Sequence, residues 1–195
     1  MEILAGGVRG VAALLPGAWN PPTSAHVAMA RAALRAADCA VLVLPRRFPH
    51  KPLEGAPFQL RAEWLKRIAG SEPGLAAAVS EGGLFIEMAR EARAAGARRV
   101  CVVCGSDAAE RIVNWDYSGG DPIEHQLEEY ELLVAPRPAP YSPPPILRGR
   151  IHALDLEPGW QDVSSTEVRR RIRAGQRWED LVPEEIVESV RSAYS

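Results

Sequence analysis

The sequence predicts an α/β fold in which helices cover both faces of a doubly wound, parallel β-sheet. Short and nearly continuous apolar runs recur along the chain, as expected for strands that are buried on both faces of a sheet. Between them lie segments with apolar residues at three- and four-residue spacing, which is typical of amphipathic helices. The alternation of the two patterns favours parallel strands joined by helical crossovers.

The elements follow from these patterns in chain order. Strands are expected at the apolar runs Val11–Leu15, Ala40–Leu44, Val100–Cys104, Glu131–Ala135 and Ile151–Leu154. Helices are expected at Val27–Ala37, Phe58–Ile68, Leu84–Ala95, Asp107–Val113 and Ile123–Glu129. Proline- and glycine-rich segments at Pro45–Pro57, Tyr117–Pro122 and Pro136–Pro145 are expected to be loops.

The end of the chain has a different pattern. Two helical segments, Ser165–Ala174 and Glu184–Ala193, follow one another directly, and Pro183 lies where a proline favours a helix start. No linker long enough to separate two domains is evident. We therefore expect one domain over residues 1–195, with residues 165–195 as a small helical C-terminal cap.

Composition excludes several classes of protein. A chain of 195 residues can bury a substantial core without disulfides. Its net charge of −2 and its isoelectric point of about 6.1 disfavour binding to long nucleic acids. The first residues lack a basic segment followed by a long apolar core, and no apolar run is long enough to span a bilayer. We expect a cytoplasmic protein with no membrane partner, and a homo-oligomer remains open.

The cysteines Cys39, Cys101 and Cys104 lie inside apolar stretches, which suits a reducing compartment. Cys101 and Cys104 match the CxxC spacing of redox and zinc sites, but they lie within a strand pattern and no second ligand pair exists. We interpret them as buried strand residues. The remaining histidines, His50, His125 and His152, show no metal-ligand spacing, so no metal site is expected.

The most informative segment joins the first strong strand to the first helix, from Gly17 to His26. In open parallel sheets ligands bind beyond the carboxyl ends of the strands, where this turn is expected to lie. Gly17 would allow a backbone N–H close to a phosphate, while Thr23 and His26 could donate hydrogen bonds at the helix N-terminus. An ordinary proline-rich turn, with Thr23 as helix cap and His26 in solvent, explains these residues equally well.

A second segment, from Val163 to Ile172, places consecutive hydroxyl residues at a helix start. Glu167 follows Ser164 by three residues, as in a capping box. The side chains of Ser165 and Thr166, with Arg169 one turn later, could hold a phosphate, for which a bidentate guanidinium is well suited. A capped surface helix with solvated arginines is the alternative.

In this order the two segments resemble the nucleotidylyltransferase superfamily, whose marks are an HxGH-type turn and an ISSTxxR-type helix start. Here they are Thr23-Ser24-Ala25-His26 and Val163-Ser164-Ser165-Thr166-Glu167-Val168-Arg169. The similarity runs from about Val11 to about Val190 and is closest to the nicotinate- and nicotinamide-nucleotide adenylyltransferases. It implies a Rossmann-like fold and a reaction on ATP.

Further segments carry the same resemblance and imply further roles. They are Pro49-His50-Lys51-Pro52 with Arg61 and Leu65, Cys104-Gly105-Ser106-Asp107 with Trp115, Leu132–Pro138, and Leu181-Val182-Pro183. By resemblance, Lys51 approaches phosphate, Gly105 and Asp107 lie near the nucleotide, and Trp115 stacks on the pyridine ring. Each has a plainer alternative: a solvated lysine at Lys51, a helix cap at Asp107 and a loop anchor at Trp115.

Three residues depart from the common pattern, and the first of them leaves the acceptor open. Thr23 replaces the first histidine of the HxGH turn, as in eukaryotic-type nicotinamide-nucleotide and in pantetheine-phosphate adenylyltransferases, and Ala25 replaces its glycine. Asn20, before the two prolines, favours the pyridine-nucleotide enzymes, and so does Arg169, where the pantetheine branch usually has lysine. Trp19 replaces the usual phenylalanine.

The resemblance therefore implies adenylyl transfer from ATP, with Mg²⁺, to the 5′-phosphate of nicotinate or nicotinamide mononucleotide. His26 is expected to make the main transition-state contact, supported by Thr23 and the backbone at Gly17 and Ala18. Ser165, Thr166 and Arg169 are expected to hold the outer phosphates, and Asn20 and Trp115 the acceptor. Another acceptor such as phosphopantetheine, or a nucleotide-binding protein that has lost the chemistry, remains open.

Overall fold

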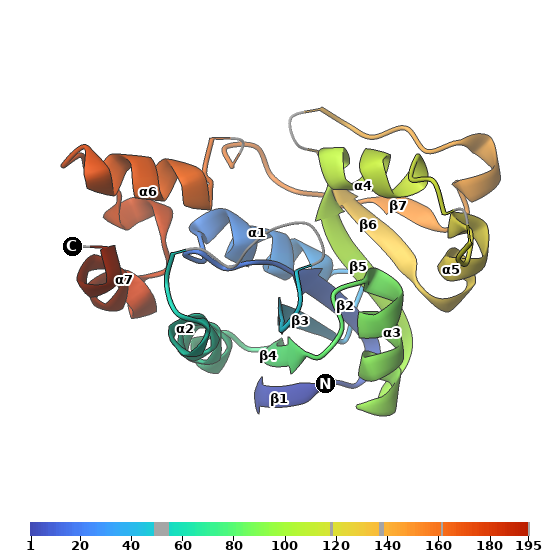
Figure 1. Cartoon of the computed structure of the whole chain (residues 1–195), viewed down its shortest axis with the longest axis horizontal. Helices are drawn as coiled ribbons and strands as arrows, with labels where there is room; N and C mark the ends of the chain where they lie inside the picture. The colour runs from blue at the N-terminus through green and yellow to red at the C-terminus, as the bar shows by residue number, and fades with distance from the viewer. Residues whose placement is uncertain (49–54, 118, 137–138, 161, 195) are drawn as a thin grey trace.

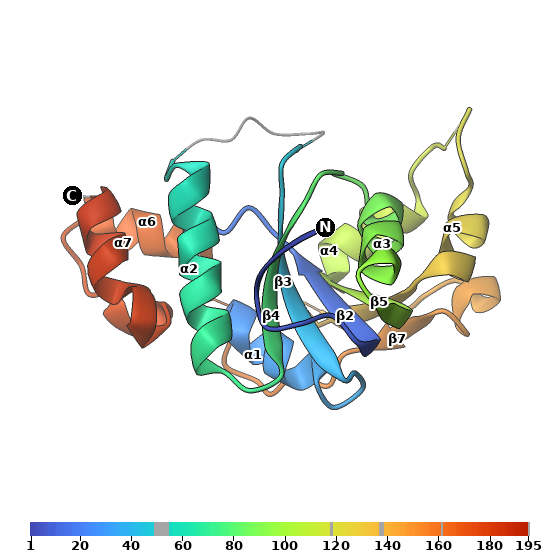
Figure 2. The ribbon, with the colours of Figure 1, turned by 90° about the horizontal axis from the view of Figure 1, so that it is seen from below.

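The computed structural model describes residues 1–48, 55–117, 119–136, 139–160 and 162–194. A twisted central sheet lies between two groups of helices (Figure 1; Figure 2). The predicted α/β class is confirmed. No helix of these residues is both long and apolar enough to cross a membrane.

The described residues form one seven-stranded sheet with the order β1-β4-β3-β2-β5-β6-β7. Its strands are β1 (Glu2–Ala5), β2 (Gly10–Pro16), β3 (Cys39–Pro45), β4 (Leu75–Ser80), β5 (Ala97–Gly105), β6 (Glu131–Ala135) and β7 (Ile151–Ala153). Strands β2 to β7 pair in parallel, and β1 pairs antiparallel with β4 at one edge. The chain order reverses at the centre, between β2 and β5.

The helices are α1 (Ser24–Ala33), α2 (Phe58–Ser71), α3 (Phe85–Ala94), α4 (Ser106–Val113), α5 (Ile123–Glu129), α6 (Ser165–Arg173) and α7 (Val187–Tyr194). The apolar faces of α1, α2, α6 and α7 share one core with one face of the sheet. Those of α3, α4 and α5 share a second core with the other face. Successive strand residues alternate between the two cores, as Ala13 and Leu14 do, so the sheet is doubly wound.

The alternation settles the interpretation of the CxxC spacing. Cys101 belongs to one core and Cys104 to the other, because residues three apart on a strand point to opposite faces of the sheet. Burial raises the pKa of the Cys101 thiol to about 11 and that of Cys104 to about 12. These are buried strand residues, as the sequence predicted.

Two strands were not predicted. β4 has the sequence Leu-Ala-Ala-Ala-Val-Ser, and alanine favours helices over strands, but six paired positions with β3 hold it in the sheet. β1 is a short edge strand. Helix α1 also differs from expectation, because it ends at Ala33 and not at Ala37. The chain turns back there, since Asp38 exchanges hydrogen bonds with Val11 at the start of the next strand pair.

Candidate functional site

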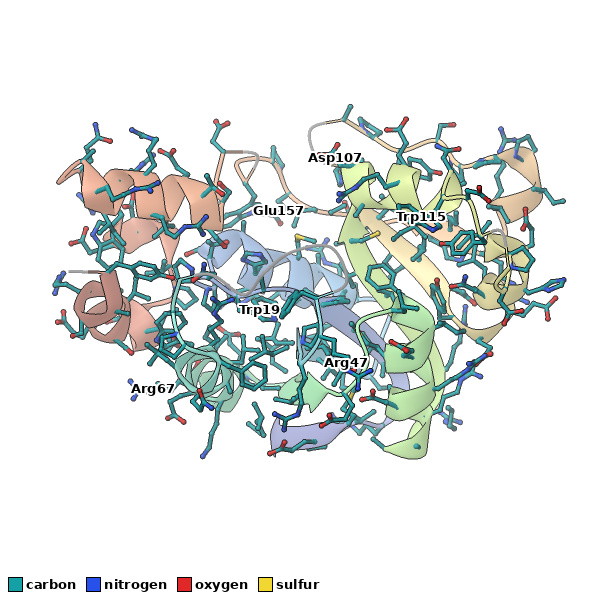
Figure 3. The ribbon with its side chains drawn as sticks, viewed as in Figure 1. Trp19, Arg47, Arg67, Asp107, Trp115 and Glu157 are labelled. Atoms are coloured by element: carbon teal, nitrogen blue, oxygen red, sulfur yellow. The ribbon has the colours of Figure 1, made fainter. Side chains whose placement is uncertain are left out.

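The turn between β2 and α1 is fixed by Trp19. Its backbone φ of 52° lies in the left-handed region, which is uncommon for a bulky residue and must be held by its surroundings. The indole is buried, and its N–H donates to the Val43 carbonyl at 2.7 Å. The indole also packs against the His26 ring, with centroids 5.0 Å apart (Figure 3 labels Trp19). Trp19 thus ties the turn to β3 and supports His26.

Gly17 has a different role from the one expected. Its N–H donates to the Val43 carbonyl at 3.1 Å, so that amide is engaged within the protein and not directed at a ligand. A Cβ at this position would lie 3.0 Å from the Trp19 indole. The expectation of a phosphate-binding amide at Gly17 is therefore not met, and the glycine provides space for Trp19.

Thr23 and His26 form one hydrogen-bonded unit at the start of α1. The Thr23 N–H donates to His26 Nδ1 at 3.0 Å, and the Thr23 hydroxyl lies 2.6 Å from the same nitrogen. Because Nδ1 accepts the amide proton, the neutral imidazole carries its proton on Nε2. His26 lies half-buried at the cleft, so its Nε2–H is a hydrogen-bond donor on a preorganised ring.

The Thr23 hydroxyl does not face the cleft, but Thr23 contacts His26, in line with the expected support of that residue. The residue is completely buried, with 0% of its surface exposed. Its hydroxyl instead lies against the inner nitrogen of His26. Thr23 is a positioning residue, which sets the tautomer and orientation of the imidazole.

The start of α6 is capped by Ser164, whose hydroxyl accepts the Glu167 N–H at 3.1 Å. The amides of Ser165 and Thr166 in the same first turn have no carbonyl partner within a helix, by the geometry of helix ends. The Ser165 hydroxyl donates to the Pro21 carbonyl at 2.7 Å, across 144 positions of sequence. The Arg169 guanidinium donates to the Asn20 carbonyl. The segment from Gly17 to His26 and the segment from Val163 to Ile172 are therefore in direct contact.

Together they line a cleft of about 580 Å³. Its described lining residues are Ala18, Trp19, Asn20, His26, Phe48, Gly55, Arg61, Ser165, Thr166, Arg169, Ile172, Arg173 and Tyr194. This set contains three arginines and no carboxylate, although the whole chain has a net charge of −2. A cleft with this lining favours an anionic ligand.

Arg61 is the most buried of these cations, with 1% of its surface exposed. Its guanidinium donates to the Ala56 carbonyl at 2.7 Å and to the Ala18 carbonyl at 2.9 Å. Burial lowers the pKa of Arg61, and the positive charge of Arg169 lowers it further. The two guanidinium groups thus act on each other in the same cleft, where an anion would relieve their repulsion.

Asn20 connects the turn to two other parts of the chain. Its Oδ1 accepts the Ala56 N–H at 3.1 Å and the Tyr194 hydroxyl at 2.5 Å. A Cβ on Gly55, whose φ is 87°, would lie 2.4 Å from the Asn20 side chain, so this close approach needs glycine. Protein donors therefore hold the side-chain oxygen, and a substrate contact of Asn20 stays a prediction. Asn20 lines the cleft and links the turn to Ala56 and to Tyr194 through its side-chain oxygen.

The other expected residues lie at the start and end of α4. Gly105 is the last residue of β5, and Asp107 lies in the first turn of α4. β5 pairs with β2 at the reversal of strand order, where ligands of open sheets bind. Trp115, labelled in Figure 3, is 56% exposed. It lines a separate depression of about 430 Å³ with Glu110, Arg111, Asn114 and Asp116. The structure does not bring Asp107 or Trp115 into the cleft with His26.

Lys51 lies outside the described residues. Sequence reasoning missed Arg61, Arg173 and Tyr194 as cleft residues. A signal existed for Arg61, because it occupies the apolar face of the Phe58–Ile68 pattern, where a charged residue needs an explanation. None existed for Tyr194, since its position depends on how α7 packs.

Comparison with known proteins completes this description. The model of the family described as cytidylyltransferase-like matches residues 14–171, which include both motifs. A search of the curated proteins found no match. The match covers most of the chain, and the family implies nucleotidyl transfer and small nucleotide substrates. The chain belongs to the cytidylyltransferase-like family, within the nucleotidylyltransferase superfamily.

Proposed function

We propose that this protein transfers the adenylyl group of ATP to the 5′-phosphate of nicotinate or nicotinamide mononucleotide, forming a dinucleotide and pyrophosphate. The observation that carries the proposal is the shared cleft, which is lined by His26 and by Ser165, Thr166 and Arg169. Its donors are an imidazole, the Thr166 hydroxyl, helix-end amides and guanidinium groups, and such donors together suit a polyphosphate chain.

The reaction needs little covalent chemistry from the protein. An oxygen of the acceptor phosphate bonds to the α-phosphorus of ATP, the bond from that phosphorus to the β-phosphate oxygen breaks, and its electron pair leaves with pyrophosphate. The attacking oxygen is already anionic, so no general base is required. Catalysis then rests on positioning and on stabilisation of the negative charge of the transition state.

In the proposed reaction, each donor of the cleft faces one part of the triphosphate. His26 donates its Nε2–H to an oxygen of the α-phosphate, with Nδ1 held by Thr23. The Ser165 and Thr166 amides and Arg169 face the β- and γ-phosphates, where charge accumulates on the leaving group. Loss of one such donor typically costs about 2.7–4 kcal/mol of barrier.

Mg²⁺ enters this proposal with the nucleotide, as part of the substrate. Among the described residues, no group of three or more histidine, cysteine, aspartate or glutamate side chains could hold a metal ion. The described lining of the cleft also has no carboxylate. Phosphate and water oxygens would therefore supply most Mg²⁺ ligands, as this ion favours.

The acceptor is the least constrained part of the proposal. Trp115 is an exposed aromatic surface that suits stacking on a pyridine ring, but it lies in the depression beside α4. A pyridine acceptor predicts that Trp115→Ala raises KM for the mononucleotide far more than KM for ATP. Equal changes in the two KM values would count against a pyridine acceptor.

One experiment tests the proposal as a whole. Pyrophosphate release from ATP is measured with nicotinate mononucleotide, nicotinamide mononucleotide, phosphopantetheine and no acceptor. Release that depends on a pyridine mononucleotide supports the proposal. Release with phosphopantetheine and with neither mononucleotide would show that the acceptor is phosphopantetheine and not a pyridine mononucleotide. ATP binding without release for any acceptor would indicate a nucleotide-binding protein that has lost the reaction.

A further inference from the structure

Helix α6 carries four arginines, at positions 169, 170, 171 and 173, and the structure divides them into two pairs. Arg170 and Arg171 share the carboxylate of Glu167: Arg170 donates to it at 2.7 and 2.8 Å, and Arg171 at 2.8 Å. Hydrogen bonds from Arg170 and then from Arg171 lower the pKa of Glu167 to about 2. These two arginines therefore belong to a closed ion-pair cluster.

Arg169 and Arg173 form the other pair. They are four residues apart, which places them one above the other on the same face of a helix, and both line the cleft. Within the described part of the chain, neither forms an ion pair with a carboxylate. Arg169 and Arg173 thus face a ligand in the cleft, whereas Arg170 and Arg171 are held by Glu167 and are not among its described lining residues.

The sequence motif ends at Arg169, so it does not explain Arg173. At a rise of about 1.5 Å per residue, Arg173 lies about 6 Å further along the helix than Arg169. If His26 faces the α-phosphate and the start of α6 faces the next phosphate, the outermost phosphate extends toward the later turn of α6. A long arginine side chain can reach it there and bind two of its oxygens.

We propose that Arg173 binds the terminal phosphate of a nucleoside triphosphate and thereby makes the cleft selective for triphosphates over monophosphates. The inference rests on the proposed function for the position of the α-phosphate at His26. The inference goes beyond the proposed function because it assigns a phosphate-selecting residue outside both motifs. Arg173 is a binding residue in this account, and it takes no part in bond breaking.

The chain offers a matched control. Arg173→Gln and Arg170→Gln remove the same charge from the same helix, but only Arg173 lines the cleft. Both side chains are exposed, so both variants are expected to fold, which thermal unfolding checks. Calorimetric titration with ATP, ADP and AMP in the presence of Mg²⁺ then measures the dissociation constants of wild type and variants.

Loss of a charge-assisted contact to phosphate should weaken ATP binding by about tenfold or more in Arg173→Gln. AMP binding should stay within about twofold of wild type, because AMP lacks the outer phosphates, and Arg170→Gln should leave ATP binding within about twofold. Unchanged ATP binding in Arg173→Gln, equal weakening of ATP and AMP, or equal weakening by Arg170→Gln would each overturn the inference. If Arg173→Gln shows the expected loss of ATP binding but the wild type releases no pyrophosphate with any acceptor, the proposed reaction is overturned. This inference about Arg173 would then still stand.

Discussion

Thr23 offers the sharpest test of how the site is organised. The Thr23→Val substitution keeps the shape and volume of the side chain and removes only its hydroxyl, which lies 2.6 Å from His26 Nδ1. The backbone N–H of the same residue still donates to Nδ1 at 3.0 Å. The variant therefore weakens, but does not abolish, the hold on the imidazole.

The size of the effect follows from the lost hydrogen bond. One such bond contributes about 0.5–1.5 kcal/mol, and each 1.36 kcal/mol changes a rate by about tenfold. If the whole free energy of the lost hydrogen bond acts in the transition state, kcat falls to about 2- to 12-fold below wild type. His26→Ala should lower kcat by about 100-fold or more, since it removes the donor itself.

The assay is steady-state pyrophosphate release, with ATP varied at a saturating level of the acceptor that supports turnover. KM for ATP should change by less than about twofold in Thr23→Val, because a completely buried side chain does not touch the nucleotide. Thr23→Ser, which keeps the hydroxyl, is the control and should retain most of the wild-type kcat. A raised KM with unchanged kcat, or a wild-type kcat in Thr23→Val, would refute the positioning role.

Three further predictions concern hydrogen bonds and burial within the fold. Tyr194→Phe removes the donor to Asn20 Oδ1 and should lower the free energy of unfolding by about 1 kcal/mol in urea titrations. An unchanged free energy of unfolding would contradict the stabilising link between Asn20 and Tyr194. Burial raises the pKa of Glu131, but hydrogen bonds from Arg99 and His152 outweigh it and leave this pKa below its ordinary 4.5. A carboxyl with a lowered pKa stabilises the fold at pH values above its ordinary pKa and loses this contribution as the pH falls through the lowered pKa. The free energy of unfolding should therefore decline below about pH 4.5, and less steeply in Glu131→Gln. The three buried cysteines should react with iodoacetamide only as the protein unfolds, and fast labelling of native protein would contradict their burial.

The fold was largely predictable because its strands are buried on both faces. Continuous apolar runs identified β2, β3, β5, β6 and β7, and their pairing is parallel as expected. β4 escaped because its alanines carry no strand preference of their own, and its place depends on pairing with β3. Sequence patterns thus reveal strands whose side chains favour them, and miss those that tertiary contacts impose.

The candidate site was predictable as a set of residues but less so in their roles. The motif residues His26, Ser165, Thr166 and Arg169 do line one cleft. The direction of the Thr23 hydroxyl and of the Gly17 amide could not be predicted, because both depend on neighbours fixed by the fold: His26 Nδ1 and the Val43 carbonyl. Arg173 and Tyr194 reach the cleft through the packing of α6 and α7 beside α1 and α2 (Figure 1), which residue order does not specify.

The central claim is that both motifs act on one nucleotide. A crystal structure with α,β-methylene ATP and Mg²⁺ tests it most directly, because the reaction breaks the link between the α- and β-phosphates that this analogue replaces. The account predicts the triphosphate between α1 and α6, with an α-phosphate oxygen about 3 Å from His26 Nε2 and the outer phosphates against Arg169 and Arg173. A triphosphate bound elsewhere, for instance in the depression beside Trp115, would contradict it.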